Sequence, residues 1–354
     1  MRGEWYSGIQ IISKCDPILC KLEMFLSLVV PLASYVLAAA ANDVRPLVMW
    51  HGMGDNYASP GILRFESEVK HIHPGIFVHS VYIDRDAKED QRAGYYGNVN
   101  AQIALVAEQL ASIPELRRGF DAVGFSQGGQ FLRGYVERYN DPPVFNLVTF
   151  GSQHMGVSDI PECRTFDFLC EVARRAAKAG AYTEWVQEHI VQAQYFRDPA
   201  QLGIYMSVGG FLADINNEVP LPSSKNETYA DKLASLESLV LVLFEQDTTV
   251  VPKESAWFGS EAPMEEYEIP SLDVHDRPSD RLLDQQPVNN DWRTRHTAII
   301  PMQLQPLYVD DYIGLRSLDE RGAISLVTCP GGHMNLTGCW EDLVGEWVGQ
   351  PFPN

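Results

Sequence analysis

The chain has 354 residues, of which 45% are hydrophobic and 21% charged, so it is long enough to bury one sizeable core. Its formal net charge of -20 and its isoelectric point near 4.8 argue against nucleic-acid binding, because phosphates would be repelled. They equally argue against a polybasic membrane contact.

An uncharged apolar run occupies residues 24–41, with Lys14 and Lys21 ahead of it and alanines at its end. This pattern predicts a signal peptide over residues 1–41. A membrane anchor is the alternative, but the run contains a proline and is short for a span. The stretch before Met24 is unusually long for a signal peptide, so either its n-region is long or translation starts at Met24.

The first strand of the mature chain is predicted at residues 46–50. It ends in a glycine-rich loop, His51-Gly52-Met53-Gly54-Asp55. A second strand is expected at residues 75–83, and a helix at residues 99–112, where apolar side chains recur on one side.

A nucleophile elbow is predicted where the apolar strand 122–125 runs into Gly124-x-Ser126-x-Gly128 and a helical pattern follows. The glycines are needed because a serine on a strained strand-to-helix turn leaves no room for side chains two residues away. The alternative is an ordinary glycine-rich turn. With a strand before and a helix after it, the motif predicts Ser126 as a nucleophile.

The helix after Ser126 carries apolar side chains at four-residue spacing, which predicts one face packed on the sheet: Phe131, Leu132, Tyr135, Val136 and Tyr139. Its first backbone N–H, from Gln127, is the expected first half of an oxyanion hole. The loop after the first strand is the expected source of the second half, from Met53. An ordinary strand-to-helix turn is the alternative for that loop.

Another strand is predicted at residues 144–150. The segment 152–235 then departs from strand–helix alternation, and its centre, residues 173–196, has helical spacing. We expect a cap inserted over the carboxyl edge of the sheet, where it would shape a substrate site. A pair of core helices is the alternative.

The most apolar strand is predicted at residues 238–244, and it delivers Asp247 at its carboxyl end. In hydrolases that carry such a nucleophile elbow, the triad acid follows the serine along the chain and lies just beyond a strand, so Asp247 is the candidate acid. Asp214 follows no strand, and Glu245 could still belong to the strand itself. A solvated loop carboxylate is the alternative for Asp247.

The composition of residues 261–295 shifts to Pro, Asp, Glu and Asn, which predicts a surface loop and makes His275 and His296 weak catalytic candidates. A last strand is predicted at residues 323–329. His333 follows it and completes the order Ser, Asp, His, although a surface or structural role is the alternative.

Four cysteines remain after the signal peptide, and their two short spacings suggest local disulfides, Cys163 with Cys170 and Cys329 with Cys339. No Cys-x-x-Cys or His-x-x-His spacing supports a metal site, and no cofactor is expected. Two sequons, at Asn226 and Asn335, fit passage through the secretory pathway.

Together these patterns predict one α/β-hydrolase domain over residues 42–354, with a mostly parallel central sheet flanked by helices and a helical cap. His333 would take the Ser126 proton while Asp247 holds the imidazole. The motifs alone indicate a serine acyl hydrolase.

Longer blocks of sequence resemble the soluble, lysosomal palmitoyl-protein thioesterase family. These blocks run in order from about Leu47 to Trp347, and the resemblance rests on five of them: Val48-Met49-Trp50-His51-Gly52-Met53-Gly54-Asp55, Gly124-Phe125-Ser126-Gln127-Gly128-Gly129-Gln130-Phe131-Leu132-Arg133, Ala179-Gly180-Ala181-Tyr182, Phe211-Leu212-Ala213-Asp214-Ile215-Asn216 and Ser255-Ala256-Trp257-Phe258-Gly259.

The resemblance implies removal of palmitoyl and other long-chain fatty acyl groups from S-acylated cysteines of proteins or peptides, in the lysosome or vacuole. It also implies the family triad at Ser126, Asp247 and His333, the oxyanion donors Met53 and Gln127, and a family disulfide between Cys163 and Cys170.

The chain departs from the family at three places. Residues 270–295 look like an insertion. Cys329 and Cys339 match no disulfide of the family, and a glycan on Asn335, two residues from His333, would crowd the site.

Two other functions use the same features. A secreted lipase or carboxylesterase would apply the same triad to oxyesters, and an inert acyl-binding protein would keep the scaffold without turnover. The complete triad argues against the inert acyl-binding protein. Comparing thioester with oxyester turnover distinguishes a lipase or carboxylesterase from a thioesterase.

Overall fold

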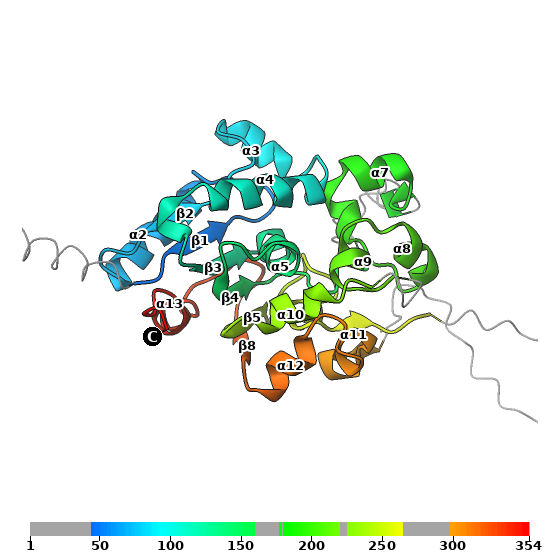
Figure 1. The fold of residues 1–354 in the computed structure, drawn as a ribbon. Helices are drawn as coiled ribbons and strands as arrows, with labels where there is room; N and C mark the ends of the chain where they lie inside the picture. The colour runs from blue at the N-terminus through cyan, green and yellow to red at the C-terminus, as the bar shows by residue number, and fades with distance from the viewer. Residues whose placement is uncertain (1–43, 160–176, 179, 220–224, 265–297, 354) are drawn as a thin grey trace, which may run out of the picture.

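The computed structural model describes residues 44–159, 177–178, 180–219, 225–264 and 298–353 (Figure 1). The predicted signal peptide, the Cys163–Cys170 pair, His275, His296 and most of the predicted loop 261–295 lie outside these residues. Within the described residues no helix is both long and apolar enough to cross a membrane.

The centre of the molecule is a six-stranded sheet in the order β2-β1-β3-β4-β5-β8, with every neighbouring pair parallel. The strands are β1 (Leu47–Trp50), β2 (Val78–Ser80), β3 (Phe120–Phe125), β4 (Val144–Phe150), β5 (Ser238–Phe244) and β8 (Ile324–Cys329). Each lies within or overlaps a strand predicted from the sequence. The parallel sheet flanked by helices confirms the predicted α/β-hydrolase fold class.

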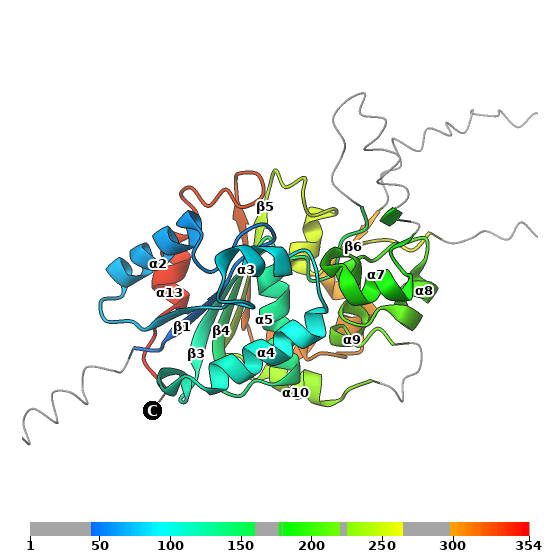
Figure 2. The same cartoon turned by 90° about the horizontal axis from the view of Figure 1, so that it is seen from above.

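Both faces of the sheet are apolar, because alternate strand residues enter two different cores. In β1, Val48 and Trp50 belong to one core, whereas Leu47 and Met49 belong to the other. One face is covered by α4 (Val99–Ala111), α5 (Gln127–Arg138) and α10 (Thr228–Ala234), and the other by α2 (Pro60–Ile72) and α13 (Glu341–Trp347) (Figure 2). The sheet is therefore buried between two helical layers.

The remaining elements are short. The helices are α3 (Ala87–Ala93), α7 (Glu184–His189), α8 (Leu202–Val208), α9 (Leu212–Ile215), α11 (Pro306–Val309) and α12 (Leu315–Glu320). The 3-10 turns are η1 (Pro114–Leu116), η2 (Val191–Tyr195), η4 (Lys253–Trp257) and η6 (Met302–Leu304), and β6 (Ser260–Glu261) pairs antiparallel with β7 (Ile299–Ile300).

Helix α5 is buried almost all round, and not on one face only. It packs on β3 and β4 and also contacts the neighbouring helices α4 and α10. The predicted apolar stripe is buried except for its last member, since Tyr139 caps the helix and is 39% exposed. The prediction was wrong for Tyr139 because the helix ends at Arg138.

The continuous helical pattern predicted over residues 173–196 is broken where it was expected to run on. Helix α7 ends at His189, and Ile190 adopts an extended conformation in an antiparallel bridge with Tyr96. The Val191 N–H donates to the Tyr95 carbonyl at 3.1 Å. These hydrogen bonds to a distant loop replace the bonds that would have continued the helix.

A buried carboxyl at the start of β3 makes stability depend on pH. Burial raises the pKa of Asp121 to about 7, although Arg45 and two backbone N–H groups favour the ionised form. An unfolded Asp has a pKa of about 3.9. Between these two pKa values the folded chain therefore keeps a proton that the unfolded chain releases. The resulting contribution of Asp121 to the free energy of unfolding is full below about pH 4 and is lost as pH rises through about 7.

We expect the free energy of unfolding of the wild type to fall between pH 5 and pH 8, and this fall to be smaller in Asp121→Asn, which cannot ionise. Urea unfolding at a series of pH values measures both slopes. The matched control is Asp342→Asn, at an exposed position of α13, which should keep the wild-type slope. Identical slopes in wild type and Asp121→Asn would contradict the assignment.

Candidate active site

Ser126 lies on the tight turn between β3 and α5, with φ of 52° and ψ of -122°. A non-glycine residue at positive φ is strained and is held there by its surroundings. A Cβ on Gly124 would lie 2.2 Å from the Gly129 Cα, and one on Gly128 would lie 2.3 Å from the Trp50 carbonyl oxygen. These contacts give the physical reason for both glycines of the motif.

The three predicted triad side chains lie together at the carboxyl edge of the sheet. His333 Nε2 is 3.1 Å from Ser126 Oγ, and His333 Nδ1 is 2.7 Å from Asp247 Oδ2. A carboxylate only accepts hydrogen bonds, so Nδ1 carries the proton that is donated to it. The other ring nitrogen is then free to accept the serine proton.

Asp247 is held by the loop after β5. Its Oδ1 accepts from the N–H groups of Thr249 at 2.8 Å and Val250 at 3.0 Å, which leaves Oδ2 for the imidazole. The rival Asp214 instead accepts from Arg138 and Tyr229, and Glu245 is exposed. Neither rival contacts His333 among the described residues.

The predicted oxyanion donors flank Ser126. Gln127 is the first residue of α5, and the first N–H groups of a helix have no partner within it. A Cβ on Gly52 would lie 3.2 Å from Ser126 Cβ, so the loop that carries Met53 abuts the serine. The donor roles of Met53 and Gln127 stay a prediction.

Residues of the predicted cap contact both Met53 and Gln127, which the sequence pattern did not indicate. Gln192 donates from Nε2 to Met53 Sδ at 3.1 Å and to the Gly94 carbonyl at 2.9 Å. The Tyr195 hydroxyl donates to Gln127 Oε1 at 3.2 Å. Each contact joins residues far apart in sequence, so no local spacing could have predicted it.

A buried pair lies behind the same loop. His51 Nε2 is 3.1 Å from Asp90 Oδ2, although not in good hydrogen-bond alignment, and His51 Nδ1 is 3.0 Å from the Gly52 carbonyl. Burial raises the pKa of Asp90, but the contact with His51 and the N–H groups of Tyr57 and Ile83 outweigh it and hold that pKa below its ordinary value. The pair joins the loop to α3.

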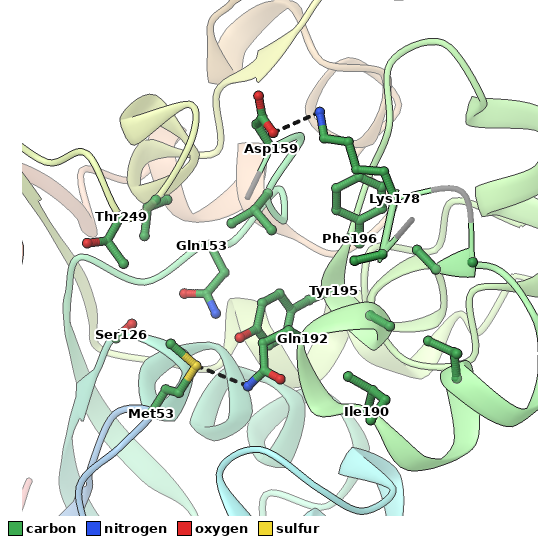
Figure 3. Close-up of a pocket in the computed structure, with 17 residues that line it drawn as sticks. Met53, Ser126, Gln153, Asp159, Lys178, Ile190, Gln192, Tyr195, Phe196 and Thr249 are labelled. Carbon is green, nitrogen blue, oxygen red and sulfur yellow. Dashed lines mark hydrogen bonds and ion pairs between the residues drawn. The ribbon is translucent and has the colours of Figure 1, made fainter. Parts of the chain in front are cut away.

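A cavity of about 340 Å³ opens beside Ser126 and is lined mostly by apolar side chains (Figure 3). Its walls come from the segment after β4, the loop after Asp247, and the α7–η2 region: Val157, Val186, Ile190, Ala193, Phe196 and Val250. In Figure 3, Met53 and Ser126 lie at one end, and Asp159 and Lys178 at the other, paired at 2.8 Å. The cavity has the size and polarity of a site for an apolar ligand.

The structure contains a disulfide between Cys329 and Cys339. Asn226 and Asn335 are both exposed, and their glycosylation stays a prediction. Among the residues that the structure describes, no three His, Cys, Asp or Glu side chains gather into a possible metal site.

Comparison with known proteins identifies relatives over most of the chain. Residues 46–333 match the family described as palmitoyl protein thioesterase. The chain is 38% identical to palmitoyl-protein thioesterase 1 of Caenorhabditis elegans, over 86% of this chain and 94% of that protein. It is 28% identical to palmitoyl-protein thioesterase 3 of Dictyostelium discoideum, over 83% and 87% of the two chains. It is 24% identical to the human lysosomal thioesterase PPT2, over 91% and 95%.

Proposed function

Because this chain belongs to the palmitoyl protein thioesterase family, we propose that it hydrolyses long-chain fatty acyl thioesters, such as palmitoyl groups on S-acylated cysteines of proteins or peptides. The observation that carries the proposal is the Ser126 hydroxyl, which lines an apolar cavity and lies 3.1 Å from the His333 imidazole. A nucleophile, its base and an acyl-sized apolar site are thereby brought together.

In the acylation step, the Ser126 oxygen attacks the thioester carbonyl carbon while His333 Nε2 takes the serine proton. The carbon–sulfur bond then breaks, and the imidazolium returns the proton to the departing cysteine sulfur. The acyl group is left as an ester on Ser126. Asp247 accepts a hydrogen bond from the His333 Nδ1–H, and its negative charge stabilises the imidazolium that forms between these events.

In the deacylation step, His333 takes a proton from water, and the hydroxide attacks the ester carbonyl carbon. The carbon–oxygen bond to Ser126 breaks, and the same proton returns to the serine oxygen. The products are the free fatty acid and the restored serine.

Both steps pass through a tetrahedral oxyanion, which the backbone N–H groups of Gln127 and Met53 would stabilise. The N-terminus of α5, a helix of 12 residues, adds its positive dipole end at the same place. One such donor is typically worth about a hundredfold or more in rate. The Gln192 and Tyr195 contacts matter because they hold the residues that supply these donors.

The cavity selects the acyl group by apolar contact, at about 0.8 kcal/mol for each buried methylene. We expect Ala193→Phe, which places a ring in the cavity, to lower kcat/KM for palmitoyl thioester about tenfold or more while leaving butyryl thioester nearly unchanged. Assays with thioesters of graded length measure the shift. Ala200→Phe, at an exposed position of the same region, is the control that should keep the wild-type profile.

The proposed location is the secretory pathway, with the lysosome or vacuole as destination. The human relative is named as lysosomal, and a disulfide is typical of an oxidising compartment. The described residues contain no membrane-spanning helix. The limits of the cap, at residues 152–235, and of the single domain, at residues 42–354, are part of this proposal.

The deciding assay compares kcat/KM for an S-palmitoyl peptide with that for the matched O-palmitoyl serine peptide. We expect the thioester to be preferred by at least about tenfold, and Ser126→Ala to remove both activities. Equal or greater turnover of the oxyester would assign the protein to general esterases instead.

A further inference from the structure

One disulfide joins the two ends of the loop that carries His333. Cys329 is the last residue of β8 and is fully buried, and its disulfide partner Cys339 lies next to α13, with 5.5 Å between their Cα atoms. His333 lies inside the ring that the disulfide closes. The link therefore joins the end of a sheet strand to the far end of the catalytic loop.

Few backbone hydrogen bonds restrain this loop among the described residues. Gln246 N–H donates to the Gly331 carbonyl at 3.1 Å, which ties the loop's beginning to the strand end beside Asp247. Within the loop, Asn335 N–H donates to the Gly332 carbonyl at 2.9 Å. Within the described part of the chain, the half of the loop after His333 has only local backbone bonds, such as Cys339 N–H to the Leu336 carbonyl at 3.2 Å.

The same half of the loop is strained. Met334, next to His333, has φ of 60°, a conformation that a side chain with a Cβ adopts only when its surroundings impose it. A loop under strain with few backbone bonds relaxes unless an additional restraint holds it. Apolar contacts of Met334, Leu336 and Trp340 with the core supply part of that restraint.

We propose that the Cys329–Cys339 disulfide is a positioning device that holds His333 within hydrogen-bonding distance of both Ser126 and Asp247. The inference rests on the proposed function for its substrate, but the proton transfer from Ser126 is common to any acyl transfer at this site. Cys329 and Cys339 are thus positioning residues, which act through the imidazole and do not touch the acyl group.

The test compares wild type with Cys329→Ala/Cys339→Ala and with Cys329→Val/Cys339→Ala, in which valine refills the buried position. The readouts are kcat and KM for an S-palmitoyl peptide, and the rate at which a fluorophosphonate modifies Ser126. We expect kcat and the modification rate to fall together by about tenfold to a hundredfold, because an ångström of misplacement costs that much. KM should stay within about twofold, because the cavity is untouched.

Reduction of the native enzyme with a phosphine is the second arm. It should lower both rates of the wild type to the level of the double variants, with reoxidation restoring them, and should leave the double variants unchanged. Cys163→Ala/Cys170→Ala is the matched control, and its rates should respond to reduction as those of the wild type do.

A folded double variant with wild-type kcat and modification rate would overturn the proposal, and so would a change confined to KM. If the double variants fail to fold, the phosphine-reduced wild type tests the proposal instead. An unchanged rate of Ser126 modification in the reduced enzyme would contradict a positioning role, and so would its global unfolding, measured by circular dichroism. If the wild type cleaves no palmitoyl thioester, the proposed function fails, while the modification rates still test the disulfide.

Discussion

Replacing Ser126 by alanine is expected to lower kcat for palmitoyl-thioester hydrolysis by about 10⁴- to 10⁶-fold. The mutant keeps the apolar cavity and the backbone N–H groups, but it has no oxygen to attack the acyl carbon. Among the described residues, the Ser126 hydroxyl makes one side-chain hydrogen bond, the 3.1 Å contact with His333. We therefore expect unchanged folding and palmitate binding within about twofold of wild type.

Steady-state kinetics and a binding titration with palmitate measure the two quantities on the same protein. Ser158→Ala, at a serine whose hydroxyl donates to the Val251 carbonyl and which does not line the cavity, is the control that should retain activity. Turnover of Ser126→Ala near the wild-type rate would remove the serine from the mechanism.

Replacing Asp247 by asparagine is expected to lower kcat by about 10⁴-fold with little change in structure. An amide oxygen can still accept the N–H groups of Thr249 and Val250, so the loop keeps its shape. The amide nitrogen then faces His333 Nδ1 as a donor, which favours the tautomer with the proton on Nε2. With a proton already on it, His333 Nε2 can no longer accept the serine proton.

The rival carboxylate supplies the control. Asp214→Asn removes the charge beside Arg138 but does not reach the imidazole, so its kcat should stay within about threefold of wild type. Crystal structures or circular dichroism of both variants exclude a fold change. A larger loss in Asp214→Asn than in Asp247→Asn would assign the role of the acid to Asp214 instead.

Much of the sheet, and the placement of Ser126, Asp247 and His333 at one edge of it, was predictable because both depend on local patterns. Apolar runs bounded by turn residues predicted each parallel strand, and Ser126, Asp247 and His333 each follow one of them. Carboxyl ends of parallel strands meet at one edge, so the order along the chain implied the meeting point in space.

The parts that escaped prediction depend on contacts between distant residues. The helix expected over residues 173–196 breaks at Ile190 because a bridge to Tyr96 replaces its hydrogen bonds. Tyr195 contacts Gln127 and Gln192 contacts Met53, and His51 meets Asp90 from another element. The spacing of residues along the chain does not predict contacts between partners so far apart in sequence.

The most direct measurement is mass spectrometry of the enzyme quenched in acid during turnover of an S-palmitoyl peptide. We expect a palmitoyl mass increase on the proteolytic fragment that contains Ser126, absent from Ser126→Ala and enriched if deacylation is the slow step. An acyl group found on another residue, or hydrolysis that proceeds in Ser126→Ala, would contradict a serine-bound intermediate.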